Sequence, residues 1–145
     1  MAYISQAHRA MMYPLFVYGT FREGESNREV IEPFVAGCRP ARLPDAALFF
    51  VDPYPMAVDG DGSVVGELIT LPADHYDTAL AVLDRFEGYE PASDAGAYRR
   101  RLRQVYDVGS GEQVSAWVYL GDAAAVLGHR VIPSGDWSRR SDLDE

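Results

Sequence analysis

The sequence contains a single cysteine, Cys38, among 145 residues. One cysteine excludes an internal disulfide, which fits a reducing compartment. We expect Cys38 to be a small buried side chain, because free cysteines usually pack in protein interiors. The N-terminal stretch MAYISQAHRAMMYP also lacks the basic-then-apolar order of a secretory signal. The expected location is therefore cytoplasmic.

Basic residues are outnumbered by acidic ones, and the formal net charge is −9. This acidity argues against generic binding to nucleic-acid backbones or anionic membranes. No apolar run reaches the ~20 residues of a membrane-spanning helix. His8, His75 and His129 are scattered without partners at ligand spacing, so no metal site is indicated. We expect no nucleic-acid, membrane or metal partner, and the sequence does not indicate an oligomeric state.

Apolar side chains make up 48% of the sequence, enough for a core that needs neither metal nor disulfide. The length suits one domain over residues 1–145, and neither an internal repeat nor a low-complexity linker divides it. We expect a core over about residues 14–137, a loose N-terminal leader and a polar C-terminal tail.

Short apolar runs bounded by turn residues predict strands. The clearest are residues 15–18, 46–51, 63–71, 98–108 and 113–120, with turns at 59–62 and 109–111. Ser26 with Glu29 matches a capping box for a short helix. A longer helix is predicted from Pro72 to about Glu87, where Gly88 can end it. Strands and helices do not alternate regularly, which favours an α+β domain with a mostly antiparallel, curved or barrel-like sheet.

Glu87 is the most informative single residue. At 100° per residue it lies about 20° from Leu80 and about 40° from Leu83, which define the apolar face of the predicted helix. A carboxylate on that face loses hydration, and its neutral form is favoured, as suits a proton carrier. The alternative is that the helix frays before Glu87 and leaves it in water.

The second feature is the loop that follows the first predicted strand, at Tyr18, Gly19, Thr20 and Phe21. A strand that runs into glycine leaves successive backbone N–H groups free to converge on an anion or a carbonyl oxygen. The spacing lacks the second glycine and the lysine of a phosphate-binding loop. An ordinary turn is the alternative interpretation.

Four arginines form a basic run in this acidic chain: Arg99, Arg100, Arg101 and Arg103. They predict either a solvated sheet face paired with nearby acids or a guanidinium that orients an anionic substrate. Trp117 and Tyr119 alternate on a predicted strand, and core packing explains them better than nucleobase stacking.

Several short motifs follow one another in a set order. They are FVYGTFR at 16–22 with Gly24 and Asn27, VGEL at 65–68, LDRFEGY at 83–89, YRR at 98–100, AWVY at 116–119 and IPSGDW at 132–137. In this combination they resemble the γ-glutamylcyclotransferase-like superfamily, which includes the AIG2-like proteins. The resemblance covers about residues 14–137, and its first and third motifs are the most specific.

The resemblance implies a small mixed, mostly antiparallel β-barrel flanked by helices. It also implies catalysis by Glu87, as general acid/base, and a pocket between that residue and the loop. The substrate-binding residues that it implies are Tyr18, Gly19, Thr20, Phe21, Arg22 and Tyr98. Enzymes of the family release 5-oxoproline from γ-glutamyl amines or amino acids and need no metal or cofactor.

We therefore expect an enzyme that cyclises a small-molecule γ-glutamyl substrate. Glu87 would take a proton from the α-amino group and return it to the leaving amine, while backbone N–H groups hold the substrate. Two alternatives stay open: a non-catalytic small-molecule binding module on the same fold, and a tailoring enzyme that removes a γ-glutamyl group from a specialised metabolite. The sequence does not identify the leaving amine.

Overall fold

The computed structural model describes residues 12–144, with side chains for residues 12–140. Its strands are β1 (Leu15–Val17), β2 (Gly37–Val51), β3 (Tyr54–Thr70), β4 (Arg99–Asp107), β5 (Gln113–Leu120) and β6 (Arg130–Val131). Its α-helices are α2 (Arg28–Ile31) and α3 (Tyr76–Glu87). Four 3-10 helices complete the described part: η1 (Glu32–Phe34), η2 (Ala73–His75), η3 (Ala123–Val126) and η4 (Trp137–Asp144). The expected α+β class is confirmed.

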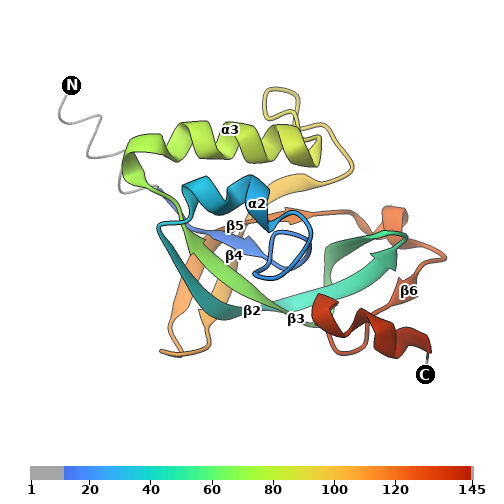
Figure 1. Cartoon of the computed structure of the whole chain (residues 1–145). Coiled ribbons are helices and arrows are strands. Elements are labelled where there is room, and N and C mark those ends of the chain that lie inside the picture. Colours follow the sequence, from blue (N-terminus) through green and yellow to red (C-terminus); the bar gives the residue numbers. More distant parts are fainter. Residues whose placement is uncertain (1–11, 145) are drawn as a thin grey trace.

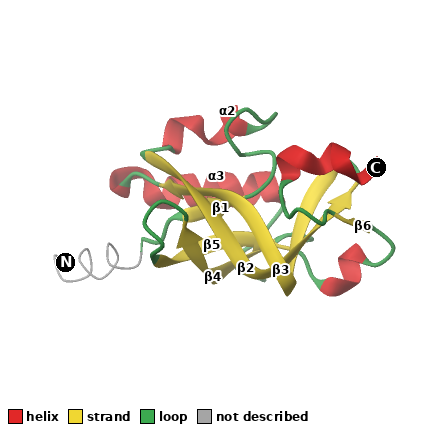
Figure 2. Cartoon of the chain, turned by 90° about the horizontal axis from the view of Figure 1, so that it is seen from below, coloured by secondary structure: helices red, strands yellow, loops and turns green. Residues whose placement is uncertain are grey.

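Five strands close into a small barrel, because β2 pairs with β3 at the two ends of the strand order β3-β1-β5-β4-β2. The pairing of β1 with β5 is parallel, and the other pairings around the barrel are antiparallel. The short β6 adds to the edge of β2. Figures 1 and 2 show α2 and α3 on the same side of this barrel. The sheet architecture expected from the sequence is thus confirmed.

The β2–β3 hairpin corrects one prediction, because residues 59–62 do not form a turn. β3 continues through them, and the chain reverses instead at residues 52–53. Near Gly62, whose φ is +120°, the pairing register with β2 shifts between Pro44 and Ala46. An irregularity of this kind bends a strand without ending it. The glycine-rich segment therefore supplies curvature to the barrel wall.

β1 is buried on both faces, which explains its unbroken apolar sequence. Phe16 belongs to the core inside the barrel, whereas Leu15 and Val17 belong to the core under the helices. Each of the three side chains is at most 3% exposed. The end of β1 is consequently held at the junction between the barrel and α3.

α3 agrees with the helix predicted from the sequence, except that its first residues after Pro72 form η2. Leu80 and Leu83 are buried, as their spacing predicts. Gly88 adopts a left-handed conformation with φ of +72°, and its N–H bonds to carbonyls of the last turn. The helix therefore extends to Glu87 without fraying.

The predicted helix start at Ser26 is wrong, because α2 begins at Arg28 and no side chain caps it. The side-chain amide of Asn27 donates instead to Thr20 Oγ1 at 3.0 Å, and the Asn27 N–H donates to the Thr20 carbonyl at 2.9 Å. The segment after β1 thus folds back on itself as a series of turns.

The hairpin predicted around residues 109–111 joins β4 and β5 in continuous register. Trp117 and Tyr119 on β5 pack in the core under α3, as expected. Across residues 12–144, no helix is long and apolar enough to cross a membrane.

Candidate active site

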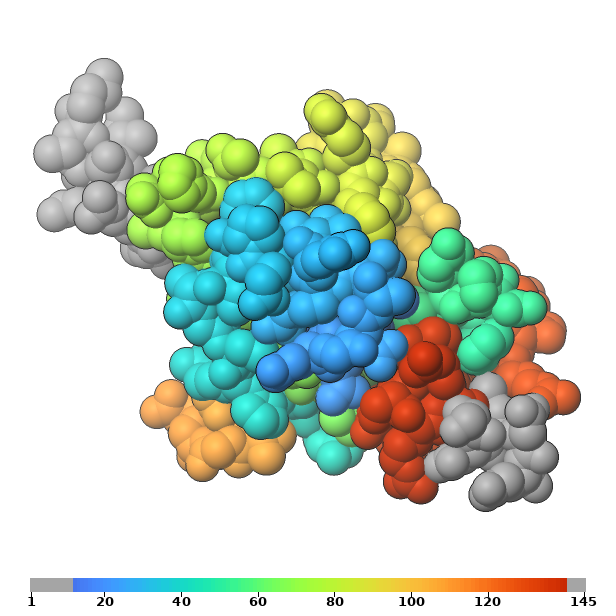
Figure 3. Space-filling view, in the orientation of Figure 1, coloured from blue at the N-terminus to red at the C-terminus, as the bar shows by residue number. Residues whose placement is uncertain are grey.

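A cavity of about 370 Å³ lies where the end of β1, the start of β3 and the C-terminal end of α3 meet. Its volume is in the range of small-ligand sites. Figure 3 shows these three segments next to one another on the surface, in blue, green and yellow-green. The cavity is lined by Phe16, Val17, Tyr18, Gly19, Thr20, Phe21 and Asn27 around β1, by Tyr54 and Pro55, by Phe86 and Glu87, and by Tyr98 and Tyr119.

Glu87, the last residue of α3, lines this cavity with its carboxylate. Among the described side chains and backbone groups, none donates a hydrogen bond to it or forms an ion pair with it. Burial raises the pKa of Glu87 from 4.5 to about 7, because desolvation disfavours the charged form. Near neutral pH the group therefore exchanges a proton readily in both directions.

Three tyrosines surround the carboxylate, and each hydroxyl donates to another group. Tyr18 donates to the Tyr119 carbonyl at 2.6 Å, and Tyr98 donates to the Pro55 carbonyl at 2.6 Å. Tyr119 donates to Asp84 Oδ1 at 2.7 Å. Burial raises the pKa of all three phenols, and the nearby charge of Glu87 raises each further. The tyrosines thus form a neutral, fixed wall and leave Glu87 free.

The loop after β1 presents backbone donors to the same cavity. The N–H groups of Gly19, Thr20 and Phe21 donate to no protein group in the described part of the chain. A β-carbon at Gly19 would overlap the ring of Pro55, so the close approach of this loop to β3 requires glycine. Free N–H groups in an apolar cavity can hold a carboxylate or a developing oxyanion.

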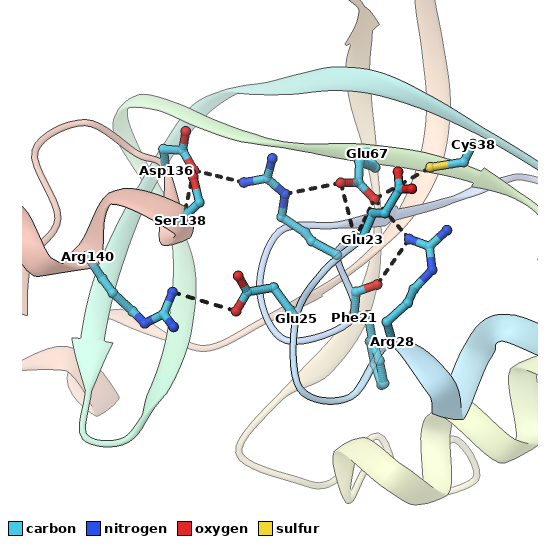
Figure 4. Close-up of polar contacts among 10 residues, drawn as sticks. Phe21, Glu23, Glu25, Arg28, Cys38, Glu67, Asp136, Ser138 and Arg140 are labelled. Atoms are coloured by element: carbon cyan, nitrogen blue, oxygen red, sulfur yellow. Dashed lines mark hydrogen bonds and ion pairs between the residues drawn. The ribbon is translucent and has the colours of Figure 1, made fainter.

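The structure brings six of the seven predicted site residues to the cavity, and Arg22 is the one it does not. The Arg22 side chain is instead held in ion pairs outside the cavity, with Nη1 2.8 Å from Asp136 Oδ1 and Nε 3.4 Å from Glu67 Oε2. Its backbone N–H bonds to the Gly19 carbonyl. Figure 4 shows that Glu67 also forms an ion pair with Arg28. Through Glu67 on β3 and Arg28 on α2, these ion pairs connect the side of the loop that faces away from the cavity to both elements. Arg22 therefore supports the loop from outside.

Cys38 belongs to this outer charged cluster, and the expectation that it is buried is wrong. Its side chain is exposed, and Sγ lies 3.5 Å from Glu67 Oε1 (Figure 4). Ala41 and Leu43 are the buried positions nearby on β2. At this end of β2, Cys38, Arg39 and Pro40 are all exposed, so neither face of the strand is covered there.

The basic run on β4 divides between two environments, and none of its arginines lines the cavity. Arg101 and Arg103 form exposed ion pairs with Asp94 and Asp59. This confirms the prediction of a paired, solvated face for those two residues. The Arg100 side chain lies on the opposite face of β4 and points into the protein interior.

Arg100 forms a buried ion pair with Asp84, which the sequence argument missed. Arg100 Nε and Nη2 lie 2.8 and 3.1 Å from the two Asp84 oxygens, and the guanidinium stacks over Trp117 at 4.5 Å. With the bond from Tyr119, this pair ties the last turn of α3 to β4 and β5. A signal for Asp84 existed, since it lies about 40° from Leu80 on the helical wheel. The cavity-lining Asn27 was also missed as a site residue, although it belongs to the first motif.

Comparison with known proteins agrees with this geometry. The family model for AIG2-like gamma-glutamyl cyclotransferases matches residues 15–139. A protein of Vibrio cholerae serotype O1 named "Putative gamma-glutamylcyclotransferase" is 35% identical over 130 residues, which span 90% of this chain and 99% of that protein. The chain therefore belongs to the AIG2-like gamma-glutamyl cyclotransferase family, as its motifs predict.

Solved structures show the same fold. An AIG2-like protein of Mus musculus is 26% identical, with a TM-score of 0.58 over 74% of this chain and 76% of that one. Protein ytfP of Escherichia coli is 28% identical, with a TM-score of 0.56 over 88% and 98% of the two chains. YkqA of Bacillus subtilis, at 24% identity, has a TM-score of 0.65 over 91% of this chain and 42% of its own.

Proposed function

We propose that this protein is a gamma-glutamyl cyclotransferase with Glu87 as its general acid/base. It would convert a γ-glutamyl amine or amino acid into 5-oxoproline and a free amine. The observation that carries the proposal is one cavity that holds a partly buried carboxylate together with backbone N–H groups, both without a partner among the described residues. Membership of the family supports this reaction type.

The loop after β1 would bind the γ-glutamyl group. The N–H groups of Gly19, Thr20 and Phe21 are suited to the substrate's α-carboxylate or to the oxygen of its γ-carbonyl as charge develops there. Removal of one such donor typically costs about 3 kcal/mol of transition-state stabilisation. Tyr98 and Tyr18 would form the walls that hold the substrate chain folded.

The reaction then needs one proton carrier. With the substrate's α-amine neutral and Glu87 ionised, the amine nitrogen attacks the γ-carbonyl carbon and passes a proton to Glu87. Glu87 donates that proton to the amide nitrogen, and the bond from carbonyl carbon to that nitrogen breaks. The products are 5-oxoproline and the free amine, and no water is consumed. A pKa near 7 suits Glu87 to both transfers.

Because nucleophile and electrophile belong to one molecule, the cavity mainly has to hold a folded conformer. Well-oriented intramolecular reactions gain on the order of 7 kcal/mol or more over their bimolecular counterparts. The rigid tyrosine wall and the fixed loop would supply this orientation. Arg22 would contribute indirectly, through its ion pairs on the outer side of the loop.

The test is 5-oxoproline release from a panel of γ-glutamyl amines and γ-glutamyl amino acids. We expect turnover by the wild type, and a loss of kcat on the order of 10²–10⁴-fold in Glu87→Gln. Glu112→Gln is the matched control, because it makes the same change at an exposed glutamate in the β4–β5 connection. Full turnover by Glu87→Gln would contradict the mechanism. Calorimetric binding of 5-oxoproline without turnover of any substrate would identify a binding module instead.

A further inference from the structure

The opening of the cavity is formed by two exposed aromatic side chains. Tyr54, the first residue of β3, is 55% exposed, and Phe86, next to Glu87 in α3, is 47% exposed. Both residues line the cavity. Beneath Phe86 lies the buried ring of Phe21, with 5.2 Å between the two ring centroids. A ligand that reaches the opening therefore meets aromatic surface on more than one side.

Among the residues that the structure describes, none places a positive charge in the lining of the cavity. Of the residues that line it, Glu87 is the only one with an ionisable acidic or basic side chain other than tyrosine. The chain contains no lysine, so a cation would have to be arginine or histidine. Arg22 is paired with Glu67 and Asp136, and Arg100 is paired with Asp84. Arg85 is exposed and lies about 200° from Glu87 around α3, on the opposite side of the helix.

These two features act on different parts of a γ-glutamyl substrate. The γ-glutamyl group carries one carboxylate, and the free N–H groups of Gly19, Thr20 and Phe21 can satisfy it. A second carboxylate on the leaving group would lie near the opening, where the described lining residues offer it no cation. Transfer of an unpaired charge into apolar surroundings is costly, and Glu87 in its ionised form would add repulsion.

We propose that the leaving group is an apolar primary amine without a carboxylate, preferably an arylalkylamine, whose hydrocarbon part packs against Tyr54 and Phe86. This inference rests on the proposed function and specifies its substrate class. Apolar contact at the opening would remove exposed aromatic surface from water. Amino acids linked through their α-amino group would be poor leaving groups, because each brings a carboxylate next to the leaving nitrogen.

The test uses four substrates that vary the ring and the carboxylate separately. They are the γ-glutamyl derivatives of phenethylamine, phenylalanine, ethylamine and alanine. Phenethylamine and ethylamine are the two amino acids without their carboxylates. We expect kcat/KM to fall on the order of tenfold or more when the carboxylate is added, and by a similar factor when the ring is removed.

Variants at the opening show whether these residues cause the preference. Tyr54→Ala and Phe86→Ala should each lower kcat/KM more for the phenethylamine derivative than for the ethylamine derivative. Phe86→Arg should shift the preference toward the phenylalanine derivative, because it adds a cation. Val82→Ala, an exposed apolar position of α3 that does not line the cavity, is the control.

Equal or faster turnover of the two amino acid derivatives would overturn the inference and leave the proposed function in place. An unchanged preference in all three variants at the opening would overturn it as well. No turnover of any of the four substrates, together with no turnover across the wider panel, would count against the proposed function itself. The two failures are therefore distinguishable.

Discussion

Gly19 lies so close to Pro55 that a β-carbon at position 19 would overlap the proline ring. Pro55 is held from its other side, because Tyr98 donates a hydrogen bond to its carbonyl at 2.6 Å. The end of β1 and the start of β3 thus share a contact that only glycine permits. This contact sets the position of the backbone donors beside Glu87.

Gly19→Ala is therefore expected to lower cyclotransferase activity on the order of tenfold or more. Overpacking of this kind costs about 1–3 kcal/mol, and it displaces the N–H groups of the loop. The measurements are 5-oxoproline release and the free energy of unfolding in urea. Gly60→Ala is the control, since a β-carbon there meets open space. Addition of Pro55→Ala to Gly19→Ala should restore part of the activity, and a Gly19→Ala protein with full activity would exclude the proposed role of the loop.

The raised pKa of Glu87 predicts the pH dependence of the reaction. If ionised Glu87 is the base, its protonation below about pH 7 lowers kcat/KM by roughly tenfold for each unit well below that value. This loss adds to the one caused by protonation of the substrate's α-amine, which must be neutral to attack, so the slope of the profile should steepen below pH 7. The measurement is kcat/KM between pH 5 and 8 with one γ-glutamyl substrate. A slope that is the same above and below pH 7 would show that Glu87 does not supply the base.

The parts of the site that the sequence predicts are those set by local patterns. Helical spacing placed Glu87 on the face of Leu80 and Leu83, and Gly88 marked the end of the helix. These features depend on residues within one or two turns of one another. The loop after β1 was recognisable for the same reason, because a strand that ends in Gly19 is a local signal.

The parts that the sequence does not predict depend on how the barrel closes. Asp84 and Arg100 are distant in the sequence, and they meet only because α3 packs over β4 and β5. The segment at residues 59–62 has turn composition, yet long-range pairing with β2 draws it into a bent strand. Cys38 shows the same dependence, since its exposure is decided by which elements cover the start of β2 and not by residue type.

Glu87 also makes stability depend on pH in a predictable direction. Its pKa is higher in the folded protein, about 7, than the ordinary value of 4.5. The favourable contribution of its protonated form is fully present below pH 4.5 and is lost as pH rises to about 7. The free energy of unfolding of Glu87→Gln, relative to that of wild type, should therefore rise by about 1–3 kcal/mol from pH 5 to pH 8. Urea unfolding of both proteins at the two pH values measures this, with Glu112→Gln as the control. A difference that does not change with pH would contradict the raised pKa.

The buried pair of Asp84 and Arg100 should matter far more to stability than the exposed pair on the same strand. Among the described residues, Arg100→Met leaves the buried Asp84 carboxylate with only the Tyr119 hydroxyl as partner. Loss of one member of a buried pair typically costs about 3–5 kcal/mol. Arg101→Met makes the same chemical change in an exposed pair with Asp94, where the expected cost is about 0–1 kcal/mol. Denaturant unfolding measures both values.

Because Asp84 lies in the last turn of α3, Arg100→Met should also displace Glu87 and reduce kcat, whereas Arg101→Met should not. Equal losses of stability in the two variants would mean that the Arg100 ion pair does not hold the end of the helix.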